Sequence, residues 1–141
     1  MKFLVGRKPQ FALLLVRLLV GITFMLHGAQ KVFGAFGGTG MNAFAQYTKT
    51  LGFHEFFGYL AALFEFVGGM LITFGIATEF GALLGLAVMV VAVFWVHLPN
   101  GFFVQNKGYE YALNLLILSI VLIIGGPGRM ALWDPFKSWR D

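Results

Sequence analysis

Four long apolar stretches constrain the fold of this chain more than any other feature. They cover residues 11–33, 56–76, 77–98 and 109–125. A transmembrane helix needs about 20 mostly apolar residues, so each stretch is predicted to cross a bilayer. Pro99, Asn100 and Gly101 end the third stretch with strong helix-breaking signals. The predicted fold class is all-α, an integral membrane four-helix bundle with antiparallel neighbours, and residues 1–141 form one domain.

The composition supports a membrane protein. Charged residues make up 11% of the chain, against about 25% in a typical soluble domain. Apolar residues reach 59%, and the mean hydropathy is +0.83. A soluble domain of 141 residues has too small a core to bury so much apolar surface. The lipid bilayer is therefore the expected surrounding of most side chains.

The charged and sulfur-containing residues exclude several classes of function. The net charge of +4 is spread along the chain, which does not suit a nucleic-acid-binding face. There are no cysteines, so this chain can hold neither a disulfide nor a cysteine-ligated iron–sulfur cluster. The sequence also offers no convincing set of metal ligands.

The distribution of lysine and arginine predicts the orientation in the membrane. Six of these residues lie in the two terminal tails: Lys2, Arg7, Lys8, Arg129, Lys137 and Arg140. The opposite side carries Lys31, Lys49 and Lys107. Positively charged residues are enriched in cytoplasmic segments. Both termini are therefore predicted to be cytoplasmic, as an even number of spans requires.

The connection between the first two spans contains a predicted short helix. In the segment MNAFAQYTKTLGF, Phe44, Tyr47 and Leu51 recur at helical spacing. This pattern fits a helix lying at the outer membrane interface. A loop helix packed on the bundle explains the same pattern equally well.

Several polar residues lie within the predicted spans, where ionisable groups are costly and commonly functional. Arg17 and Glu65 fall at similar predicted depths, which favours an ion pair that is structural rather than catalytic. Five more residues collect near the outer end of the bundle: His27, Lys31, His97, Glu110 and Asn114. His27 and Lys31 are one helical turn apart on one face. We expect these five side chains to line one small-molecule cavity, with a purely structural polar cluster as the alternative.

The same residues carry a resemblance to a known family. The relevant elements, in chain order, are Arg17 with Gly21, HGAQKVFG, Glu65 followed by Gly68 and Gly69, GIATEFGA, HLPNGFFV, GYEYALN and GGPGRMALWD. In order and spacing this pattern resembles the DoxX family of small bacterial membrane proteins, related to a subunit of thiosulfate:quinone oxidoreductase. The resemblance implies a four-helix bundle in the bacterial inner membrane and redox work with a quinone.

The first functional hypothesis is a quinone-interacting subunit of a membrane redox system. The expected catalytic residues are His27, Lys31, His97 and Glu110, with the histidines exchanging protons and Lys31 stabilising negative charge. Glu110 would relay protons outward. The expected quinone-binding residues are His27, Lys31, His97 and Asn114. Such a chain would need a protein partner or a homo-oligomer to complete a redox reaction, so its being an enzyme in its own right is left open.

Three alternatives remain from the sequence. The chain could be a non-catalytic accessory or assembly subunit of a larger, respiratory-type membrane complex. A haem held by His27 and His97 is disfavoured, because Lys31 and Glu110 beside them suggest a hydrated pocket. A transporter would require several copies to form a path, and no broken helix marks a substrate site.

Overall fold

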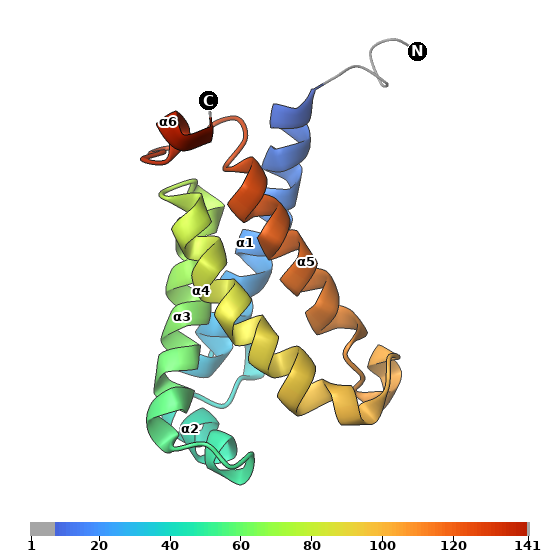
Figure 1. Cartoon of the computed structure of the whole chain (residues 1–141). Helices are drawn as coiled ribbons and strands as arrows, with labels where there is room; N and C mark the ends of the chain where they lie inside the picture. Colours follow the sequence, from blue (N-terminus) through green and yellow to red (C-terminus); the bar gives the residue numbers. More distant parts are fainter. Residues whose placement is uncertain (1–7, 141) are drawn as a thin grey trace.

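The computed structural model describes residues 8–140, which form helices joined by short turns (Figure 1). The α-helices are α1 (Pro9–Phe33), α2 (Met41–Thr50), α3 (Glu55–Phe74), α4 (Thr78–Val91), α5 (Glu110–Gly125) and α6 (Lys137–Arg140). The described range contains no β-strand, and the all-α prediction is confirmed. Lys2 and Arg7, two of the residues from which the orientation in the membrane was predicted, lie outside the described residues.

Three helical segments have the length and composition of a membrane span. They are α1, with 25 residues, α3, with 20, and the 23-residue run Thr78–Asn100. This run continues α4 through the π-helix η2 (Ala92–His97) and the 3-10 helix η3 (Leu98–Asn100). The predicted fourth span corresponds to α5, which is apolar but has only 16 residues. It ends at Gly125, as predicted, where Gly126 takes up a positive φ of 77°.

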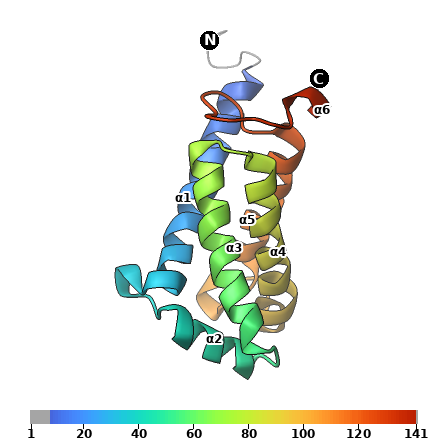
Figure 2. The same cartoon turned by 90° about the vertical axis from the view of Figure 1, so that its left-hand side faces the viewer.

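Successive long helices alternate in direction, as Figure 1 shows. The start of α1 and the whole of α6 lie at one end of the molecule, here called the terminal end. Figure 2 shows α2 at the opposite end, here called the α2 end, beneath the start of α3. The predicted short helix within MNAFAQYTKTLGF is therefore present as α2. Its buried residues are Ala45 and Thr48, and an added Cβ at Gly58 of α3 would meet both.

Glycines allow α1 and α3 to approach until their backbones touch. A Cβ added at Gly21 would lie 2.6 Å from the backbone nitrogen of Thr73. One added at Gly28 would collide with the backbone of Phe66, and one at Gly69 with that of Met25. Small residues permit such contacts between membrane helices. This contact fixes the register of the two helices along their shared length.

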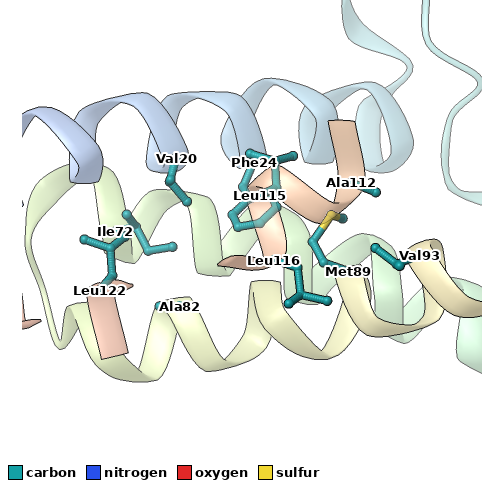
Figure 3. Packing of buried hydrophobic residues seen from close by; sticks show 10 residues of the cluster. All are labelled: Val20, Phe24, Ile72, Ala82, Met89, Val93, Ala112, Leu115, Leu116 and Leu122. Atoms are coloured by element: carbon teal, nitrogen blue, oxygen red, sulfur yellow. The ribbon is translucent and has the colours of Figure 1, made fainter. Parts of the chain in front are cut away.

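The hydrophobic core lies where α1, α3, α4 and α5 face one another (Figure 3). Phe24 from α1, Ile72 from α3 and Leu122 from α5 are fully buried. The ring of Phe24 packs against Gly85 of α4, where an added Cβ would meet it. Large apolar side chains on the outer surfaces are exposed, as expected of a chain whose solvent is lipid.

Replacing Gly69 by alanine tests the close contact of α1 with α3. The added methyl group meets the backbone of Met25, which cannot rotate away as a side chain could. We expect a loss of about 1–3 kcal/mol of stability, the range for overpacked cores. Thermal unfolding in detergent measures the change, and Ile124→Val on an exposed face serves as the control. An unchanged melting temperature for Gly69→Ala would contradict the contact.

Candidate functional site

The Lys31 ammonium and the Glu65 carboxylate form an ion pair between α1 and α3. The Glu65 side chain is 4% exposed, whereas that of Lys31 is 25% exposed. Lys31 Nζ also lies 4.8 Å from the centre of the Phe44 ring of α2, a cation–π contact. The charge of Glu65 is thus buried but compensated, which a carboxylate at this depth requires.

Arg17 does not pair with Glu65, and the predicted ion pair between them is wrong. The Arg17 side chain is 3% exposed and points to the segment after α5. Its Nη1 donates to the carbonyl oxygens of Pro127 at 2.9 Å and Arg129 at 3.1 Å. Its Nη2 donates to the carbonyl oxygen of Met130 at 3.3 Å. Arg17 therefore anchors the C-terminal segment to α1.

The register of α1 on α3 explains this correction. Gly28 lies against Phe66 and Gly21 against Thr73, so Glu65 is level with the last turns of α1. The same register brings Arg17 to Gly75, just beyond the end of α3. At 1.5 Å per residue, Arg17 and Lys31 are about 20 Å apart along α1. The sequence-based depths missed this offset because α1 begins beyond the end of α3 (Figure 1).

A cavity of about 390 Å³ opens at the α2 end, between α2, α3 and the run formed by α4 and η2. Most of its lining is apolar, with Phe57, Leu60, Ala61 and Phe64 contributed by α3. Lys31 and His97 reach it from α1 and η2. The remaining lining residues are Phe44, Tyr47, Thr48, Leu51, Phe53, Ala87, Val88, Met89, Val91, Ala92 and Val96.

His97 lines the cavity, and its ring is held by a hydrogen bond. Its Nδ1 lies 2.8 Å from the carbonyl oxygen of Lys107, in the loop before α5. A carbonyl oxygen only accepts, so Nδ1 carries the proton and Nε2 of the neutral ring is an acceptor. His97 ends the π-helix η2, a type of irregularity that is frequent at functional sites.

The other three predicted cavity residues lie elsewhere, so the prediction of a single five-residue cavity is wrong. His27 points toward α5, with Nε2 at 3.3 Å from the Tyr111 hydroxyl. Glu110 accepts a hydrogen bond from the backbone nitrogen of Val104 at 2.9 Å, which holds the loop before α5. Asn114 lines a separate groove between α1 and α5.

Sequence reasoning missed Tyr111, which contacts His27 and lines the same groove as Asn114. Its spacing of three residues from Asn114 on a predicted helix was the available signal. The aromatic wall contributed by Phe53 and Phe57 was also missed, because α2 was not expected to close a cavity against α3. Burial, ion pairing and an apolar lining together define a helical membrane protein with an open, largely apolar cavity between its helices.

Comparison with known proteins identifies the family. The DoxX family model matches residues 12–98, and the chain belongs to this family. "Putative oxidoreductase CatD" of Bacillus subtilis (strain 168) is 34% identical over 123 residues, which cover 87% of this chain and 84% of that protein. An "Uncharacterized protein" of Haemophilus influenzae is 31% identical over 81 residues, covering 53% and 54% of the two chains. No solved structure matches significantly.

A double-mutant cycle tests the pairing of Lys31 with Glu65. Lys31→Met leaves a buried carboxylate without its cation, for which we expect a loss of about 3–5 kcal/mol. Lys31→Met combined with Glu65→Leu removes both charges and should recover most of that stability. Urea or thermal unfolding in detergent measures each variant. Strict additivity of the two substitutions would contradict the pair.

Replacing Arg17 by glutamine tests its role in anchoring the C-terminal segment. The guanidinium makes three hydrogen bonds to backbone carbonyls, and we expect their loss to cost about 2 kcal/mol or more. The segment after α5 should become more susceptible to protease added to that side of the membrane. Lys49→Gln, on the exposed surface of α2 at the other end of the molecule, is the control and should leave this cleavage unchanged. Equal protection of Arg17→Gln and the unmodified chain would refute the role.

Proposed function

We propose that this chain binds a membrane quinone in the cavity at the α2 end and serves as the quinone-interacting subunit of a membrane redox system. The observation that carries the proposal is the combination of apolar walls with the Lys31–Glu65 pair and His97 at one cavity. The name of the Bacillus subtilis relative, an oxidoreductase, supports redox work.

The chemistry of the cavity suits a quinone head group. Ring carbonyl oxygens accept hydrogen bonds, and the Lys31 ammonium carries three donors, of which Glu65 occupies one. Nε2 of His97 can accept a hydrogen bond from a ring hydroxyl. Phe57 and Phe64 provide apolar surface for a ring and the start of its tail. A bound quinone would supply two-electron, two-proton redox chemistry.

Each polar residue of the cavity has a distinct proposed role. The Lys31 ammonium, held by Glu65, would donate a hydrogen bond to a ring oxygen and favour negative charge there. Nε2 of His97 would accept the proton of a ring hydroxyl, while the Lys107 carbonyl oxygen accepts from Nδ1–H and would stabilise the charged imidazole. Glu65 keeps the Lys31 ammonium in place. A partner protein supplies or removes the electrons.

We further propose the membrane arrangement that this role requires. The helices α1, α3, the run continuing α4, and α5 form an antiparallel four-helix bundle that crosses the bacterial inner membrane four times. Both termini are cytoplasmic, in agreement with the lysine and arginine residues gathered there. A helix as short as α5, with 16 residues, can span where the bilayer thins around it. Its outer face carries exposed apolar residues such as Ile117 and Ile124. The cavity then opens near the outer interface.

His97→Ala tests the proposed binding site, with His27→Ala as a matched control at the same end of the molecule. Loss of one hydrogen bond worth about 1 kcal/mol should weaken binding of a short-chain benzoquinone about fivefold. His27 lies outside the cavity, so its variant should bind normally. Calorimetric titration in detergent measures the affinities, and melting temperatures check the fold.

A cavity-filling variant completes the test. Ala61→Phe places a ring in the cavity from α3 and should abolish binding while the fold is retained. Equal affinities for all variants, or no binding by the unmodified chain, would refute the quinone site. The accessory-subunit hypothesis would then take its place.

A further inference from the structure

Helices α3 and α4 diverge from a close contact, and the space between them is here called the wedge. Near the terminal end they touch through glycines, because a Cβ added at Gly68 would lie 2.8 Å from the carbonyl oxygen of Gly81. Toward the α2 end, α4 leans away from α3 (Figure 1). The cavity lies in this widening part, with Ala61 on α3 and Ala87 and Val88 on α4 among its lining residues.

A single hydrogen bond joins the two walls of the wedge across its open end. The indole Nε1–H of Trp95, in η2, donates to the carbonyl oxygen of Leu51, which ends α2, at 3.1 Å. The rings of Trp95 and Phe53 also lie 5.1 Å apart. Leu51 and Phe53 belong to one wall of the cavity and η2 to the other. In the part of the chain that the structure describes, no other hydrogen bond joins residues 41–60 to residues 87–100.

The rim of the wedge is apolar and faces outward. Phe57 of α3 and Val91 of α4 both line the cavity, and both are exposed. Exposed apolar side chains on membrane-spanning helices lie against lipid, which cannot hydrogen-bond to them. A molecule dissolved in the bilayer therefore reaches the cavity sideways, past these two residues.

The position of Trp95 allows its hydrogen bond to break and form again. It lies five residues before the end of the run Thr78–Asn100, about 8 Å along the axis. Tryptophan is enriched at this depth, where its ring contacts lipid and its N–H reaches polar partners. Water and lipid headgroups can replace the bond to Leu51 there, so its net strength is that of one ordinary hydrogen bond.

We propose that the hydrogen bond from Trp95 to Leu51 is a clasp that controls the entry of a bilayer-dissolved ligand into the cavity. The identity of that ligand as a quinone rests on the proposed function. When the clasp opens, η2 moves away from the turn after α2, and a ring enters between Phe57 and Val91. Trp95 does not line the cavity, so the clasp sets the rate of exchange rather than the affinity.

The width of the wedge can be measured without any ligand. Because the chain has no cysteine, spin labels can be attached at Lys49→Cys of α2 and Phe94→Cys of η2, both exposed. Trp95→Phe keeps a ring against Phe53 but removes the N–H donor. Double electron–electron resonance in nanodiscs should then give a broader distribution of label distances with a longer component. Trp133→Phe, the same change at the terminal end, is the control and should leave the distribution unchanged.

Binding kinetics test the role of the clasp in entry. Trp95→Phe should raise the association and dissociation rates of a short-chain benzoquinone about fivefold each, the factor for one hydrogen bond of about 1 kcal/mol, and leave Kd unchanged. Surface plasmon resonance on the protein in nanodiscs measures both rates. Trp133→Phe should show the rates of the unmodified chain, and melting temperatures check that each variant is folded.

The two measurements separate the clasp from the quinone site. An unchanged distance distribution for Trp95→Phe would refute the clasp, whatever the cavity binds. A broader distribution with unchanged rates would refute its control of entry. Absence of binding by the unmodified chain would refute the quinone site and with it the ligand assigned here, whereas the clasp itself stands or falls by the distance measurement.

Discussion

The contact of α1 with α3 through glycine determines where the buried charges of Lys31, Glu65 and Arg17 lie. At Gly21, Gly28 and Gly69 the two backbones approach closely enough that no side chain fits between them. Backbone contacts of this kind allow no sliding, so the register is fixed. Lys31 is thereby placed against Glu65, and Arg17 is carried about 20 Å away toward the terminal end.

Buried charged side chains have different surroundings at the two ends of the molecule. At the terminal end, Arg17 binds backbone carbonyls, and Arg140 of α6 pairs with Glu79 and Asp134. Backbone hydrogen bonds between Ala77 or Gly75 and Trp133 add to this closure. At the α2 end, the Lys31–Glu65 pair borders a cavity instead. The terminal end is thus closed by hydrogen bonds and ion pairs, whereas the α2 end contains a cavity.

The sequence was sufficient for the helices but not for their contacts. Apolar runs and the stop at Pro99 predicted the long helices, because periodicity and length depend on local residues. Spacing alone also predicted α2 from Phe44 and Tyr47. The partners of Arg17 could not be predicted, because they are carbonyls more than a hundred residues away. Depth along a helix fixes neither the offset of two helices nor the neighbour that a side chain faces. His27 faces α5 whereas Lys31 faces α3, so the five-residue cavity does not form.

We propose that a quinone binds between α2, α3 and η2 rather than on the surface of the bundle. A photoreactive short-chain quinone, cross-linked in native membranes and mapped by peptide mass spectrometry, tests this directly. We expect adducts on cavity residues such as Phe57, Phe64 and Val96, and their loss in the Ala61→Phe variant. Adducts confined to Leu19 and Ile117 of the groove between α1 and α5 would contradict it.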